Sequence, residues 1–183
     1  PETRVYLMAG DQDYISADSF YRSFSWAPNV VFFAEEKVTC VKDKKLDVYI
    51  YGMSYEHPVI LNNLYANIRP SHENGIHILL AHGGDRRHCP FDAVRLAAGF
   101  DYAALGHVHA YKALIREKAL YCGAPEPLES NDFGAHGYIE GRTENGKVKV
   151  DFVPFSMRTY QQLLLNVNTD STQIRIEEAL KEE

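Results

Sequence analysis

The sequence has little cysteine, no excess of positive charge and no long apolar run. Its three cysteines, Cys40, Cys89 and Cys122, are widely spaced and form no C-x-x-C pair, which indicates neither a disulfide framework nor a structural zinc site. We therefore expect a reducing, cytoplasmic location. No apolar run approaches the length of a membrane span, so no membrane partner is expected.

The charge balance limits how this protein can bind nucleic acid. The formal net charge is -6 at pH 7, with 19 Lys and Arg against 25 Asp and Glu. Bulk electrostatic binding of DNA needs clustered Lys and Arg to neutralise phosphates. Any DNA contact must therefore be local, or supplied by a partner or by further chain. With 183 residues, 45% of them hydrophobic, the sequence is long enough for one domain with a proper core.

Three continuous apolar runs predict an α/β fold. Residues 5–9, 76–81 and 100–105 are typical of strands buried on both faces of a sheet that helices cover. We expect one helix over 16–24 with Ser16 as its N-cap, and another over 90–98 with Pro90 in its first turn. The strand, helix, strand order from 76 to 105 implies a right-handed parallel crossover.

The remainder is rich in short β patterns. Asn145-Gly146 favours positive φ and predicts a hairpin turn, and the charged residues 42–45 predict a solvated hairpin tip. Residues 52–74 are expected to be mostly loop, and 172–180 an amphipathic helix that begins near Asp170 or Ser171. We expect one domain over 1–158, followed by 159–183 as the start of a C-terminal extension or capping region. The further expected strands are 30–34, 37–41, 46–51, 111–116, 119–122, 137–142, 147–152 and 161–167.

Ligand-type side chains follow the three long apolar strands. They are Asp11, Gln12 and Asp13 after the first, His82 after the second, and His107 and His109 after the third. Sites in parallel α/β sheets form beyond the carboxyl ends of the strands, so these residues should converge. In extended backbone, residues i and i+2 point to the same side, so His107 and His109 can offer both imidazoles to one point. Three converging segments favour a metal site over two unrelated loop histidines.

Imidazole nitrogens combined with carboxylate oxygens suit Mn, Fe or Zn, whereas Mg prefers more oxygen. Two such ions about 3.5 to 4 Å apart can clamp a phosphate ester and activate a water. We interpret four other histidines, His57, His72, His77 and His88, as packing or surface residues. The role of His136 stays open, since its glycine neighbours suggest a tight turn in which the ring bonds to backbone.

Four segments resemble the calcineurin-like metallophosphoesterases. They are 9–16 (AGDQDYIS), 79–84 (LLAHGG), 101–109 (DYAALGHVH) and 121–128 (YCGAPEPL). Within that superfamily the chain is most similar to SbcD-type DNA repair exonucleases, including YhaO-like proteins. The resemblance covers nearly the whole chain. It implies the C-terminal two-thirds of a β-sandwich flanked by helices, and a centre of two divalent ions, most often Mn, with Fe, Zn or Mg as other candidates.

Carried over by position, the resemblance makes Asp11, His82 and His107 ligands of one ion and His109 a ligand of the other. Gln12 stands where the family has a histidine that helps to protonate the leaving oxygen or hold the phosphate. Asp13 would support that residue. Because glutamine cannot carry a proton, and general acid catalysis contributes about 10²- to 10⁴-fold, we expect a slow enzyme unless another group substitutes.

The family's first two motifs, which include a bridging aspartate, would lie before Pro1. We therefore expect the second metal site to be incomplete and this chain alone to be inactive. Residues 5–9 would also lie beside an empty place in the sheet, with unpaired backbone groups and exposed apolar surface. Self-association, as in a homodimer, or an N-terminal piece from elsewhere would cover them.

The resemblance implies metal-dependent hydrolysis of phosphodiester bonds by a nuclease subunit in DNA repair. DNA and an SbcC-like ATPase subunit are the implied partners. A non-catalytic module that assembles with the ATPase or binds DNA is the alternative that Gln12 favours. A phosphoesterase for small substrates is a third candidate, because a fold alone does not determine the substrate.

Overall fold

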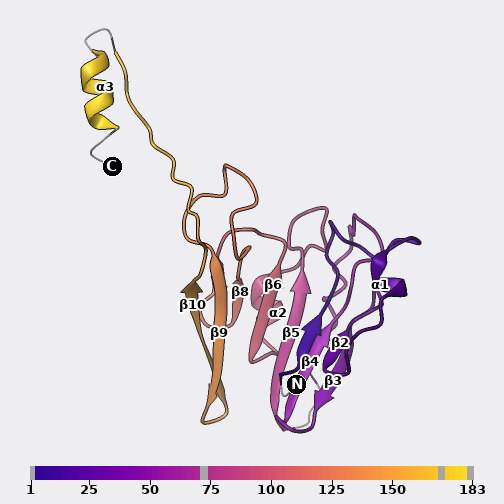
Figure 1. The fold of residues 1–183 in the computed structure, drawn as a ribbon. Helices are drawn as coiled ribbons and strands as arrows, with labels where there is room; N and C mark the ends of the chain where they lie inside the picture. Colours follow the sequence, from indigo (N-terminus) through magenta and orange to yellow (C-terminus); the bar gives the residue numbers. More distant parts are fainter. Residues whose placement is uncertain (1–2, 71–73, 169–171, 181–183) are drawn as a thin grey trace.

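A mixed six-stranded sheet forms the centre of the computed structural model, which describes residues 3–70, 74–168 and 172–180 (Figure 1). Neighbours β4, β5, β6 and β8 run parallel, and β3 and β7 pair antiparallel at the two edges. The pairing of β5 with β6 confirms that the two strands are parallel, and the right-handed crossover between them stays a prediction. In spatial order the strands are β3 (Thr39–Asp43), β4 (Val48–Gly52), β5 (Ile76–His82), β6 (Tyr102–Gly106), β8 (Ala119–Tyr121) and β7 (Lys112–Ile115).

Two separate ribbons accompany this sheet. In the first, β1 (Val5–Leu7) pairs parallel with β2 (Val30–Phe32); in the second, β9 (Gly137–Glu144) pairs antiparallel with β10 (Lys147–Pro154). Asn145 and Gly146 join β9 to β10 with φ of 52° and 72°, which confirms the predicted hairpin turn. The α/β class is also confirmed.

The hairpin predicted around residues 42–45 connects β3 to β4, but its tip is less solvated than expected. Asp43 is buried. Its Oδ2 lies 3.2 Å from Nε of Arg4 and accepts a 3.1 Å hydrogen bond from the Tyr6 hydroxyl. The charge pattern alone did not reveal these partners, because both come from the distant β1 region.

The two faces of β5 are covered unequally. His77, Leu79 and Ala81 are buried in the main core, whereas Ile78 and Leu80 line an apolar groove of about 630 Å³. The prediction of burial on both faces is therefore right for only one face of β5, whereas β6 has the buried residues Tyr102 and Ala103 on opposite faces. In the described part of the chain, loops and helix α2 (Ala93–Ala97) cover one side of the sheet. The β9–β10 hairpin covers only part of the other side.

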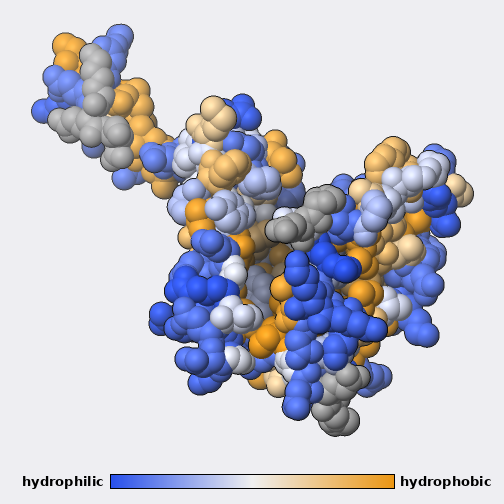
Figure 2. Space-filling view, turned by 60° about the horizontal axis from the view of Figure 1, so that its bottom comes forward, coloured by the Kyte–Doolittle hydropathy of each residue, from blue (hydrophilic) through white to orange (hydrophobic). Residues whose placement is uncertain are grey.

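The groove lies between the central sheet and the two ribbons. Its opposite wall includes Ile139 and Val148 of the β9–β10 hairpin, and Tyr6 of β1 closes one side. Figure 2 shows a hollow with apolar, orange atoms on its walls between more polar surfaces. β1 differs from its prediction in the same way, since Val5 is 42% exposed instead of buried.

The helices start later than predicted. Ser16 is not an N-cap: its hydroxyl donates to Asp18 at 2.6 Å, and Ser19 caps the first helix. Asp92, and not Pro90, precedes the second helix, and its side chain accepts from the N–H of Arg95. The described helices are α1 (Phe20–Ser23), α2 (Ala93–Ala97) and α3 (Gln173–Ala179).

The C-terminal segment contains one error of prediction. Residues 161–167 form no strand, and Figure 1 shows this segment running away from the sheet towards α3, so no strand edge lies beside it to pair with. The predicted helix over 172–180 is confirmed with Thr172 as its cap, while Asp170 and Ser171 lie outside the described residues. The boundary after residue 158 stays a prediction.

Within the described part of the chain, no helix is both long enough and apolar enough to cross a membrane.

Candidate metal centre

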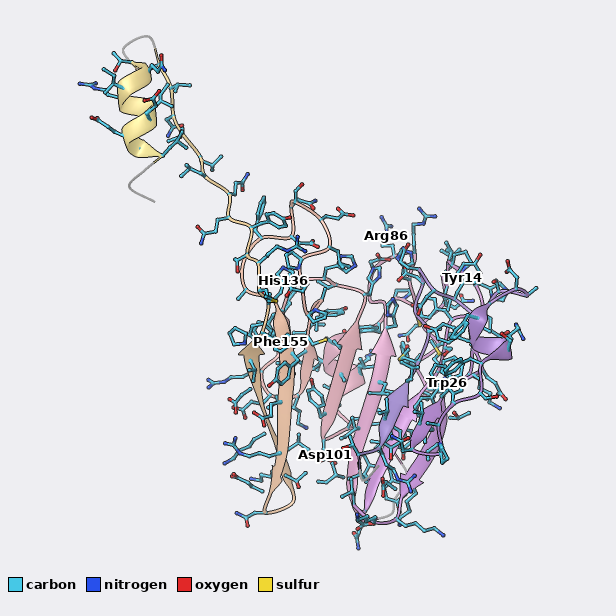
Figure 3. All side chains as sticks on the ribbon, in the orientation of Figure 1. Tyr14, Trp26, Arg86, Asp101, His136 and Phe155 are labelled. Carbon is cyan, nitrogen blue, oxygen red and sulfur yellow. The ribbon has the colours of Figure 1, made fainter. Side chains whose placement is uncertain are left out.

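Asp11, His82 and His107 come together beyond the carboxyl ends of β1, β5 and β6. Oδ1 of Asp11 lies 2.5 Å from Nε2 of His82 and 3.1 Å from Nδ1 of His107. Figure 3 shows Arg86, in the loop after β5, at this edge of the sheet, and Asp101, just before β6, at the opposite edge. The convergence predicted for the strand ends is thus present for these three residues.

Buried tyrosines hold the backbone at the end of β5. The Tyr65 hydroxyl accepts from the N–H of His82 at 3.0 Å, and the Tyr55 hydroxyl donates to its C=O at 2.8 Å. The Tyr121 hydroxyl donates to the C=O of Gly83 at 2.7 Å. Burial raises the pKa of Tyr55 and Tyr65 well above 10, so both phenols stay protonated and the strand end keeps these anchors.

Two glycines enclose the imidazole of His82. A Cβ at Gly10 would lie 2.4 Å from Cε1 of that ring, and a Cβ at Gly106 would lie 2.9 Å from Nδ1. Any larger residue at position 10 would have to displace the ring. The glycines before Asp11 and His107 therefore have a packing reason that is specific to this site.

The charge states of Asp11 and His82 suit metal binding. Burial would raise the pKa of Asp11, but hydrogen bonds with His82, Gln12 and His107 outweigh it and lower that pKa well below its ordinary value. Burial is also the main influence on His82 and lowers its pKa below 6.5, against the opposing effect of Asp11. The site thus combines an ionised carboxylate with a neutral imidazole, which are the forms that bind metals.

The geometry expected for His107 and His109 is wrong. β6 ends at Gly106, and His107 has φ of 103°, so the extended alternation stops before the first histidine. His109 does not belong to either metal-ligand group found among the described residues; its Nδ1 lies 3.7 Å from Oδ2 of Asp132. Its assignment to a second ion stays a prediction.

A second ligand-type group adjoins the first. Asp85, His88 and His107 have ligand atoms within 4.8 Å of one another, and Nε2 of His88 lies 3.7 Å from Oδ2 of Asp11. The interpretation of His88 as a packing or surface residue without ligand partners is therefore wrong. The spacing of Asp85 and His88, three residues apart after a Gly-Gly turn, was the available signal in the sequence.

Gln12 and Asp13 act locally. The amide nitrogen Nε2 of Gln12 donates to Oδ2 of Asp11 at 2.8 Å. Asp13 accepts from the N–H of Gly10 at 2.6 Å and from the Tyr21 hydroxyl, so it shapes the loop, and its support of the residue at position 12 stays a prediction. That hydrogen bond with Asp13 is the main cause that raises the pKa of Tyr21 to about 12.

The other histidines have structural surroundings where they are described. His136 is 2% exposed and lies between the carbonyl oxygens of Ala124 and Asp132, at 3.1 and 3.2 Å, as its turn suggested. His77 stacks on a tyrosine ring, and His57 pairs with Glu36 at 3.0 Å. His72 lies outside the described residues.

The residues present fit a divalent ion. Asp11, His82 and His107 contribute one carboxylate oxygen and two imidazole nitrogens from a largely buried carboxylate and two half-buried rings. Such a mixed donor set suits Mn, Fe or Zn and does not by itself distinguish among them.

Comparison with known proteins agrees with this chemistry. No protein-family model matches the chain. The chain is 29% identical over 162 residues to a Bacillus subtilis (strain 168) protein named uncharacterized metallophosphoesterase YhaO. The match covers 81% of this chain and 39% of that relative, so the chain spans well under half of the relative's length. The mixed α/β sheet is compatible with a metallophosphoesterase fold, and the similarity supports placing the chain in the metallophosphoesterase superfamily.

Proposed function

We propose that this chain is the metal-binding part of a phosphoesterase that hydrolyses phosphodiester bonds. The observation that carries the proposal is the meeting of Asp11, His82 and His107 from three separate strand ends, with Asp11 ionised and His82 neutral. The resemblance to a named metallophosphoesterase gives independent support.

Different residues of the chain would bind the metal ion, orient its carboxylate ligand and attract the phosphate. Asp11, His82 and His107 would hold one divalent ion, which when bound polarises a phosphoryl group and lowers the pKa of a coordinated water. Gln12 fixes the second oxygen of Asp11 through its amide. Arg86 and Arg87 lie on the loop that follows His82 and give it two positive charges, which would attract a phosphate towards this edge of the sheet.

The finer proposal follows the resemblance of the motifs. We propose DNA as the substrate, manganese as the preferred ion and an ATPase subunit of the SbcC type as the partner, with a role in DNA repair in the cytoplasm. His109 would contribute to a second ion whose other ligands come from chain outside this sequence. In this proposal the domain ends near residue 158, and the segment that leads to α3 begins an extension.

One observation favours a different function. Gln12 cannot donate a proton as an imidazolium would, and its amide is already bonded to Asp11. A domain with this residue could serve assembly with the ATPase, or DNA binding, without catalysis. A phosphoesterase for small substrates is the third candidate, since the site geometry does not specify the alcohol that leaves.

Manganese-dependent hydrolysis by the full-length protein separates these functions. Bis-p-nitrophenyl phosphate and linear DNA serve as substrates, and a Gln12→His variant is assayed beside the wild type. The expected result is slow cleavage of both substrates by the wild type and a rate increase of about 10²-fold or more in the variant, the lower end of general acid catalysis.

Each other result has a definite meaning. Absence of turnover and of bound metal in both proteins would refute the enzymatic function. Activity in the variant alone would show that residue 12 has made the natural site non-catalytic. Cleavage of the small ester without cleavage of DNA would favour the small-substrate function.

A further inference from the structure

The two carboxylate oxygens of Asp85 have different partners, except for Nδ1 of His88, which lies 2.9 Å from Oδ1 and 2.8 Å from Oδ2. Oδ1 accepts hydrogen bonds from the backbone N–H groups of Arg87, at 2.7 Å, and His88, at 2.9 Å. Oδ2 faces two imidazole nitrogens, Nε2 of His107 at 2.9 Å and Nδ1 of His88 at 2.8 Å. The first set of bonds folds the loop after β5, and the second set connects this loop to the candidate metal centre.

The contact with His107 bears on where that ring carries its proton. An ionised carboxylate only accepts hydrogen bonds, and a neutral imidazole has one N–H and one lone pair. A carboxyl group with an ordinary pKa of about 4 is ionised at neutral pH, so Asp85 can only accept hydrogen bonds here. Asp11 faces Nδ1 at 3.1 Å and can also accept, but a cation that takes the Nδ1 lone pair on that side leaves the hydrogen on Nε2, where it donates to Oδ2 of Asp85 at 2.9 Å.

The backbone of His107 gives separate support. A non-glycine residue with φ of 103° lies outside the usual allowed regions, and such a conformation persists only where the surroundings hold it. The contacts on opposite edges of the ring, Asp11 at Nδ1 and Asp85 at Nε2, are surroundings of that kind.

We propose that Asp85 is a positioning residue, which holds His107 in the Nε2–H tautomer and so presents the Nδ1 lone pair to a divalent ion at Asp11 and His82. The inference rests on the metal centre of the proposed function and deepens it. The same carboxylate accepts from Nδ1 of His88, which leaves Nε2 of that ring unprotonated and 3.7 Å from Oδ2 of Asp11. A carboxylate behind a metal-binding histidine fixes its tautomer and orientation and increases its basicity.

A separate ion held by Asp85, His88 and His107 is the competing explanation of the same cluster. A neutral His107 has one lone pair and cannot ligate through both nitrogens. The Asp11 side chain is 4% exposed, whereas that of Asp85 is 49% exposed, so water competes much less for a cation at Asp11. The lone pair of His107 therefore belongs on the Asp11 side.

Asp85→Asn is the test variant because it changes only part of the residue's contacts. The amide oxygen of Asn can still accept from the backbone N–H groups of Arg87 and His88 and from Nδ1 of His88, but its NH₂ group cannot accept from Nε2 of His107. Asp85→Ala removes both sets of bonds. Asp92→Asn is the matched control: Asp92 also accepts a backbone N–H, from Arg95, in capping α2 outside the histidine cluster.

Two readouts are taken on the chain as it stands. Long-range ¹H–¹⁵N NMR of the metal-free protein, above the ordinary histidine pKa of about 6.5, reports the tautomer of His107. Calorimetric titration with Mn²⁺ and with Zn²⁺ reports affinity and stoichiometry. The wild type and Asp92→Asn should show the Nε2–H tautomer and equal affinity.

In Asp85→Asn the Nε2–H preference should disappear and affinity should fall about 10- to 100-fold, with thermal unfolding close to that of Asp92→Asn. Asp85→Ala should lose the same affinity and also unfold at a lower temperature. Wild-type affinity in Asp85→Asn, or an Nδ1–H tautomer in the wild type, would overturn the proposal. Loss of one of two bound ions in Asp85→Asn would overturn it in favour of the separate ion.

A wild type that binds neither ion would remove the basis of the proposed function. The NMR tautomer in the metal-free protein would still decide the role of Asp85.

Discussion

At the scale of single residues, the candidate centre depends on glycine as much as on its ligands. The His82 ring lies between Gly10 and Gly106, and it is so close to Gly10 that no side chain fits at position 10. Asp11 then meets Nε2 of that ring at 2.5 Å. The ligand geometry therefore depends on the absence of a Cβ atom at position 10.

Gly10→Ala should weaken metal binding by about 10- to 100-fold, the range found when groups that orient a ligand are changed. The new Cβ would lie 2.4 Å from Cε1 of His82 and must push the ring away from Asp11. Titration with Mn²⁺ checks the prediction. Gly141→Ala is the control, because its Cβ would meet Val150 at an ordinary 3.5 Å; equal affinity in both variants would contradict the packing argument.

At the scale of elements, the β9–β10 hairpin is built from local sequence signals. Its eight residue pairs run in uninterrupted register from Lys147–Glu144 to Pro154–Gly137. The turn residues Asn145 and Gly146 both have positive φ. The hairpin also supplies Ile139 and Val148 to the wall of the groove, so the stability of the hairpin affects the shape of the groove.

Gly146→Val should lower the free energy of unfolding by about 1 to 2 kcal/mol, the cost of left-handed backbone for a residue with a side chain. No atom lies within 4 Å of a Cβ at this position, so the loss reports backbone conformation and not a clash. Urea denaturation measures it. Asn145→Gly keeps positive φ accessible and should change stability far less; similar losses in both variants would argue against this cause.

At the scale of the whole molecule, the sheet carries apolar residues for two covered faces, and the described chain covers one of them fully and the other in part. Ile78 and Leu80 of β5 line the groove opposite the hairpin, with β1 at its side (Figure 2). Apolar strands of this kind usually belong to sheets buried on both sides. In the chain as it stands, a second copy is the occupant that we predict for the groove.

Sedimentation of the chain at micromolar concentration should therefore show a mass above 20.8 kDa. Ile139→Lys, on the hairpin wall of the groove, should shift the protein towards the monomer, because a charge would replace buried apolar contact. Val94→Lys is the control, since Val94 is an exposed apolar residue on α2 outside the groove. An intact wild-type monomer with no bound peptide would refute the prediction.

Much of the fold could be predicted because its signals are local. The apolar run that ends at His82 forms β5, and Asn145-Gly146 forms the hairpin turn. Helix starts were less certain, since Ser16 and Ser19 are both suitable caps and only the path of the chain decides between them. The run at 161–167 has strand-like composition, but pairing requires a neighbouring edge, which composition does not provide.

The sequence by itself indicated that Asp11, His82 and His107 converge beyond the carboxyl ends of three strands, because the strand ends and their order follow from the apolar runs. Only the tertiary structure decided which nitrogen of His107 faces Asp11, that Asp85 and His88 adjoin the site, and that His109 lies outside the cluster. The physical reason is that these contacts join residues far apart in the sequence, and that His107 has a positive φ which no local pattern encodes.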